Sequence, residues 1–92
     1  MHVIQLARRQ WLVIDVHYRP RFLIVEAPLV LRETGETHMK HRVEWWSPDP
    51  ARRHVLTVHD GLLAAENWCR DEIAKSAEER GRISSSVARR GF

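Results

Sequence analysis

The chain contains a single cysteine, Cys69, and no apolar run that approaches the roughly 20 residues needed to cross a bilayer. One cysteine excludes an intramolecular disulfide framework and fits a reducing compartment. The first residues lack the charged-then-apolar layout of a secretory signal. We therefore expect a cytoplasmic protein with no membrane partner.

Motifs for catalysis and metal binding are also missing. The chain has no Gly-rich phosphate loop, no Gly-x-Ser-x-Gly and no nucleophile beside a base. It has six histidines, but His38 and His41 are three apart in a predicted strand and point to opposite faces. His54 and His59 diverge in the same way. We predict no metal site, no cofactor and no enzymatic activity.

What the chain does have is charge that is sorted by segment. Residues 1–59 carry nine Lys/Arg and six Asp/Glu, residues 60–79 carry two and six, and residues 80–92 carry four and none. This pattern indicates a near-neutral body, an acidic helix and a basic tail. A basic tail can bind phosphates, an acidic partner or its own acidic helix.

Hydrophobic periodicity predicts the fold. Period-2 patterns indicate strands over residues 11–18 and 38–46, and a mostly apolar run over 22–26 indicates a strand covered on both faces. A short final strand is expected at 54–58, and a first strand at 2–6 that turns through Arg8 and Arg9. Pro28 is expected to interrupt the chain, and Gly35 to supply a hairpin loop. From Leu62 the apolar spacing becomes helical, with Asp60 as N-cap and Gly81 as the stop.

These elements predict the α+β class. We expect an antiparallel sheet of about four to five strands with one long C-terminal amphipathic helix packed on one face. Residues 1–80 would form a single domain, and residues 81–92 a basic, flexible tail.

The strongest candidate for acid–base chemistry is the pair Asp15 and His17. Two residues apart in a predicted strand, they share a face, and a carboxylate can orient an imidazole. This pair supports a small nuclease as one alternative. Cys69 lies on the apolar stripe of the helix and fits a small buried hydrophobe better than a nucleophile.

Tryptophan and arginine provide the candidate binding residues. If Trp45 joins Val43 in the core, Trp46 is exposed beside Arg42 and can anchor a partner or stack on a base. Alternatively, the loop at residues 48–50 caps Trp46. Basic residues gather mainly in predicted turns, where they can grip phosphates. The candidate binding residues are Arg8, Arg9, Arg19, Arg21, Lys40, Arg42, Trp46, Arg52, Arg53, Arg89 and Arg90.

The segment from Val55 to Trp68 runs from a last strand into a capped helix with an Ala-Glu-x-Trp sequence. Over residues 38–75 the chain resembles the sheet-plus-helix modules of phage integrase arm-binding domains and of small phage proteins, including anti-CRISPR inhibitors. Integrase modules usually lack an acidic helix and continue into a further domain. The resemblance therefore implies a free-standing protein that occupies a partner.

Three hypotheses follow from these patterns. The first is a non-enzymatic inhibitor that masks a surface of a larger protein or nucleoprotein target. The second is a DNA- or RNA-binding module that uses the sheet face, because the acidic helix would be repelled by phosphate. The third is the small nuclease. A homodimer is also expected, through the tail of one subunit on the helix of another or through an unpaired edge strand.

Overall fold

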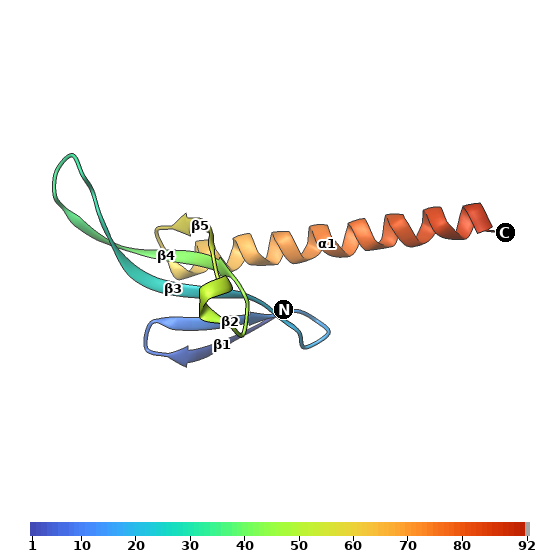
Figure 1. The fold of residues 1–92 in the computed structure, drawn as a ribbon, viewed down its shortest axis with the longest axis horizontal. Coiled ribbons are helices and arrows are strands. Elements are labelled where there is room, and N and C mark those ends of the chain that lie inside the picture. Colours follow the sequence, from blue (N-terminus) through green and yellow to red (C-terminus); the bar gives the residue numbers. More distant parts are fainter. Residues whose placement is uncertain (92) are drawn as a thin grey trace.

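The computed structural model describes the backbone of residues 1–91 and the side chains of residues 1–77. It consists of one sheet, one short 3-10 turn and one long helix (Figure 1). The elements are β1 (His2–Ala7), β2 (Gln10–Ile14), β3 (Pro20–Val30), β4 (Thr37–Trp45), η1 (Pro50–Arg52), β5 (Val55–His59) and α1 (Leu62–Gly91). Neighbouring strands pair antiparallel in the order β1-β2-β3-β4-β5. The predicted α+β class, with a C-terminal helix on the sheet, is confirmed.

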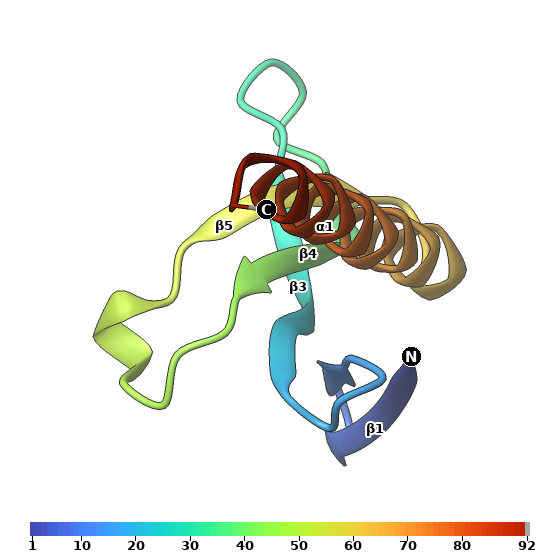
Figure 2. The same cartoon turned by 90° about the vertical axis from the view of Figure 1, so that its right-hand side faces the viewer.

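Helix α1 packs on one face of the sheet and extends well beyond it (Figure 1), as the end-on view also shows (Figure 2). We call the face that α1 contacts the inner face and the opposite one the outer face. The buried inner core joins four strand residues to two helix residues, namely Val13, Phe22, Ile24, Val43, Ala65 and Cys69. Leu62, Trp68 and Ile73 pack against this cluster from α1, so the predicted apolar stripe does face the sheet.

Both predicted hairpin turns are present. The chain reverses between β1 and β2 at Arg8 and Arg9. Between β3 and β4 it reverses around Gly35, whose φ of 72° lies in the left-handed region that favours glycine. The N–H of Gly35 donates to the carbonyl of Leu31 at 2.8 Å and closes this turn.

The predicted strand over residues 11–18 is too long, because β2 ends at Ile14. The next residue, Asp15, folds the chain into a turn by accepting hydrogen bonds from backbone N–H groups further along it. Tyr18 in this turn has a φ of 60°, which no regular strand allows. Alternating apolar residues therefore continue past the point where the strand stops.

Pro28 does not interrupt β3, which continues to Val30. The pairing of β3 with β2 ends at Val25, and beyond it β4 is the partner through Val30. Proline is tolerated where one side of a strand is unpaired, because no ladder bond is lost on that side.

The helix is longer than the sequence predicts. An end near Gly81 is expected, whereas the backbone is helical as far as Gly91. Residues 81–91 contain no proline, and an interior glycine costs a helix only about 1 kcal/mol relative to alanine. The domain boundary at residue 80 and the mobility of residues 81–92 stay predictions. Within the described residues, no helix has the length and apolarity required to span a membrane.

Candidate binding surfaces

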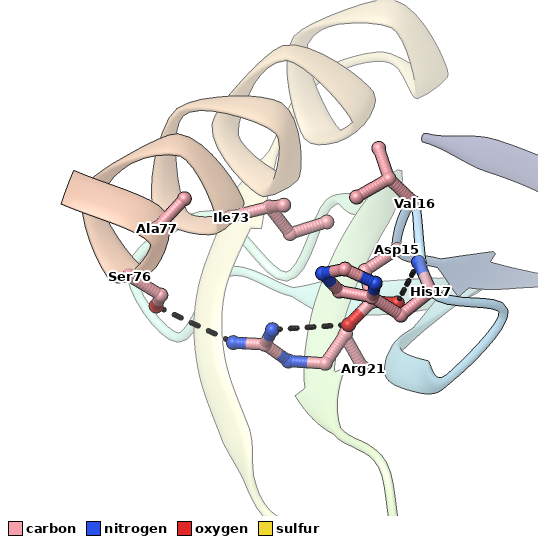
Figure 3. Close-up of a pocket in the computed structure, with 7 residues that line it drawn as sticks. All are labelled: Asp15, Val16, His17, Arg21, Ile73, Ser76 and Ala77. Atoms are coloured by element: carbon pink, nitrogen blue, oxygen red, sulfur yellow. Dashed lines mark hydrogen bonds and ion pairs between the residues drawn. The ribbon is translucent and has the colours of Figure 1, made fainter. Parts of the chain in front are cut away.

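Asp15 organises the turn between β2 and β3 (Figure 3). The residue is only 2% exposed. Its Oδ1 accepts hydrogen bonds from the backbone N–H groups of His17, at 2.8 Å, and Arg19, at 3.1 Å. Its Oδ2 accepts from Nη1 of Arg21 at 3.4 Å. The carboxylate therefore holds both the turn and the first residues of β3.

These contacts also fix the ionisation of Asp15. Burial alone would raise the pKa of its carboxyl group. The backbone N–H groups of Arg19 and His17, together with the guanidinium of Arg21, outweigh burial and hold the pKa below its usual value. Asp15 is thus charged near neutral pH and engaged by three donors.

The predicted pairing of Asp15 with His17 on a strand face is not formed. Both residues belong to the turn, and the bond between them uses the backbone N–H of His17. No hydrogen bond joins the imidazole of His17 to the carboxylate among the described residues. This geometry gives the ring no carboxylate to orient it for acid–base chemistry.

Arg21 connects the turn to the helix. Its Nη2 donates to the hydroxyl of Ser76 at 3.3 Å, and that hydroxyl donates to the carbonyl of Glu72 at 3.1 Å. A cavity of about 40 Å³ lies between the turn and α1. Sites for small molecules usually measure about 300–1,000 Å³, so this cavity holds water-sized groups only.

Three large apolar side chains are exposed at the end of the sheet where this turn lies. Val16 is 64% exposed and Tyr18 is 77% exposed. Trp45, at the end of β4, is 45% exposed and contacts Phe22 edge-on, with ring centroids 5.9 Å apart. Because Phe22 is the register partner of Trp45 and Pro20 of Ile14, these side chains share one end of the sheet. We call Val16, Tyr18, Trp45 and the exposed Arg19 the turn patch.

The sequence did not predict the exposure of three members of the turn patch. The period-2 pattern predicts Val16 and Tyr18 as strand residues, and Trp45 is considered only as a core residue beside Val43, in one of two alternatives. Val43 is fully buried, but Trp45 at the strand end keeps 45% of its surface exposed. Pro20 is a signal that could have placed Tyr18 in a turn, because proline removes a ladder donor and fixes φ.

Trp46 follows the second of its two predicted arrangements. It is half-buried, and the guanidinium of Arg53 lies 4.6 Å from its ring centroid. Arg53 also donates from Nε to the carbonyl of Ser47 at 2.8 Å. The loop around η1 therefore covers Trp46, and a stacked arginine in this geometry stabilises the aromatic ring.

The predicted basic residues do not form one surface, because many have acidic partners. Lys40 pairs with Asp60, Arg42 pairs with Glu44 at 2.7 Å, and Arg21 pairs with Asp15. Arg52 lies 3.8 Å from a carboxylate oxygen of Asp49. Among the described residues, the candidates that are exposed and make no ion pair are Arg8, Arg9 and Arg19.

The side chains of Arg89 and Arg90 lie outside the described residues.

Asp60 was expected to cap α1. It accepts a hydrogen bond from Lys40 instead, and this bond holds the pKa of its carboxyl group below the usual value.

Cysteine and histidine occupy the interface between sheet and helix. Cys69 is fully buried, and burial raises the pKa of its thiol to about 12. His41 and His59 are register partners on β4 and β5, next to Trp11 and Trp68. Nδ1 of His41 and Nε2 of His59 are buried without a hydrogen-bond partner. In the part of the chain that the structure describes, no group of three or more His, Cys, Asp or Glu is arranged to hold a metal ion.

Comparisons with protein-family models, with curated proteins and with solved structures find no match to this chain. The resemblance to phage sheet-plus-helix proteins stays a prediction.

Proposed function

We propose that the protein is a small non-enzymatic binding protein that masks a surface of a larger protein or nucleoprotein target, as anti-CRISPR inhibitors do. The observation that supports this function is the turn patch. Tyrosine, tryptophan and arginine are the residues most enriched at the energetic centres of protein interfaces. Here Tyr18, Trp45 and Arg19 are each exposed at the same end of the sheet, with Tyr18 beside β1 and Trp45 on β4.

The contacts beneath the patch support the same function. The Asp15 carboxylate fixes the backbone on both sides of Tyr18, and the ring of Tyr18 stacks on His2 with centroids 5.6 Å apart. Arg21 ties the turn to Ser76 on α1. A surface held in place before binding loses less conformational entropy when the partner arrives. The mechanism would be steric blockage, with Arg19 supplying the electrostatic contact.

The test compares two substitutions of similar size at different places. Tyr18→Ala removes the most exposed apolar member of the patch, which is 77% exposed, whereas Leu63→Ala removes a 69% exposed leucine on α1. A target retained from cell extract by the wild type would be purified and its affinity measured with each variant. Tyr18→Ala should weaken binding at least tenfold, as truncation of an interface anchor does, and Leu63→Ala should not. Equal affinities for both variants would remove the turn patch from the site.

Direct nucleic-acid binding is the second candidate, because Arg8, Arg9 and Arg19 are exposed and make no ion pair within the described residues. Three arginines offer few phosphate contacts, and each contact adds about 0.9 to the slope of log affinity against log salt. Fluorescence anisotropy with duplex and single-stranded DNA and RNA at two salt concentrations measures this slope.

Tight binding with a slope near 3 that falls in an Arg8→Ala/Arg9→Ala variant would favour the nucleic-acid module. A truncation after Arg80 shows whether Arg89 and Arg90 contribute. Absence of binding near physiological salt would leave the protein target as the function of these arginines.

A further inference from the structure

The outer face of the sheet has unusual apolar content for a surface that no helix covers. Antiparallel sheets with one helix-covered face normally present polar residues on the other face. Strand β3 instead carries apolar side chains on both faces, since Leu23 and Val25 alternate with the inner-face residues Phe22 and Ile24. The outer face thus has the apolar composition of a sheet face that is covered by a second layer of structure.

Several outer-face side chains are substantially exposed. Strand alternation and register place Ile4, Leu29, Val55 and Val58 on this face, with exposures of 48%, 44%, 50% and 48%. A groove of about 210 Å³ opens between β3, β4 and β5, and Leu29, Val55 and Val58 line it. The one helix among the described elements, α1, lies on the other face (Figure 2).

Charge on the outer face is balanced. The charged residues that β4 places there are Lys40, Arg42 and Glu44, and each has an opposite partner in the same chain. Arg42 and Glu44 lie side by side, with Nε 2.7 Å from Oε2. A two-fold interface brings a patch against itself, so a charge within it needs an opposite charge in the same patch. This face meets that condition, whereas a nucleic-acid-binding face would be predominantly basic.

From these observations we infer that the outer face docks a second copy of this chain about a two-fold axis. The two sheets would stack face to face at the usual spacing of about 10 Å, with a helix on each outside. Leu29, Val55 and Val58 of one subunit would pack against the same residues of the other. Arg42 of each subunit would lie within reach of Glu44 of its partner. The residues that carry this inference are not members of the turn patch, so the inference does not depend on the proposed function.

The experiment measures the mass of the full-length protein by sedimentation equilibrium over a concentration series. The wild type should approach twice the monomer mass of 10.8 kDa. Val58→Lys introduces a charge on the outer face, and the two-fold axis would bury it twice. It should raise the dimer dissociation constant about 100-fold or more, because burying an unpaired charge is costly.

Leu63→Lys is the matched control, since Leu63 is even more exposed but lies on α1. It should leave the mass unchanged. Leu29→Lys repeats the test from β3, and tryptophan fluorescence with circular dichroism verifies that each variant is folded. A monomeric wild type at high micromolar concentration would overturn the inference. So would a dimer that survives both Val58→Lys and Leu29→Lys, because another surface would then hold the subunits together.

Discussion

Replacing Asp15 should destabilise the fold far more than replacing any surface carboxylate. The side chain is 2% exposed and engages two backbone N–H groups and one guanidinium. Hydrogen bonds to a charged group contribute about 1.5–3 kcal/mol each. Asp15→Ala removes both backbone bonds and the partner of Arg21, so the free energy of unfolding should fall by about 3–6 kcal/mol.

Asp15→Asn removes the negative charge of the side chain but keeps its size and shape. The amide oxygen can replace Oδ1 and still accept from His17 and Arg19, but these bonds lose their charge assistance. The amide nitrogen then faces Nη1 of Arg21, which is also a donor. We expect a loss of about 2–3 kcal/mol, smaller than for alanine. A natural domain has a total stability of only about 5–15 kcal/mol, so both variants should unfold at clearly lower urea concentrations.

The effect of Asp15 should depend on pH in one direction. Its pKa in the folded protein is below the ordinary value of 3.8. A carboxylate of this kind contributes its full stability above the ordinary pKa and loses it as the pH falls through the folded-state pKa. Asparagine does not titrate. The stability difference between wild type and Asp15→Asn should therefore be constant near neutral pH and shrink below pH 3.8.

Urea unfolding monitored by tryptophan fluorescence measures these differences, since the chain has four tryptophans. Asp71→Asn is the control, because Asp71 is exposed on α1 and should change stability by less than about 0.5 kcal/mol. The reasoning fails if Asp15→Asn and Asp71→Asn are equally stable at pH 7. It also fails if the difference between wild type and Asp15→Asn does not shrink in acid.

Three further measurements test the interior and the turns. The thiol of Cys69, whose pKa burial raises to about 12, should react with a disulfide reagent at pH 8 only after unfolding, and rapid labelling of the native protein would contradict this. His59→Phe removes an unpartnered buried ring nitrogen beside Trp68 and should raise the free energy of unfolding by about 1 kcal/mol; a decrease would show that the nitrogen is satisfied. Gly35→Ala should cost about 1–2 kcal/mol because of its positive φ, whereas Gly61→Ala, also in open space, should cost nothing; equal costs in urea unfolding would rule out backbone strain.

Local pattern was sufficient to predict most elements of this fold. The hairpin at Gly35 and the helical stripe beginning at Leu62 both follow from residues close together in the chain. The end of β2 was predicted wrongly, because the apolar alternation continues through Val16. The chain turns where the Asp15 carboxylate accepts hydrogen bonds from the N–H groups of His17 and Arg19. These bonds are local, but they leave no mark on the spacing of hydrophobic residues.

The candidate site was harder to predict for the same reason. Arginine and lysine are visible in the sequence as charges, but their partners are set by the tertiary fold. Lys40 meets Asp60 from 20 residues away, and Arg21 meets Ser76 from 55 residues away. These contacts divide the predicted basic surface. The turn patch became visible only because the chain reverses around Tyr18.

The small core connects these features. The fully or nearly buried hydrophobic residues number seven in the described part of the chain, and a domain of this size buries a low share of its surface on folding. Polar contacts such as those of Asp15 therefore contribute a larger share of the stability of the fold than they would in a larger domain. Stacking two outer faces would cover Val25 and Val58 and add apolar burial that one chain does not supply.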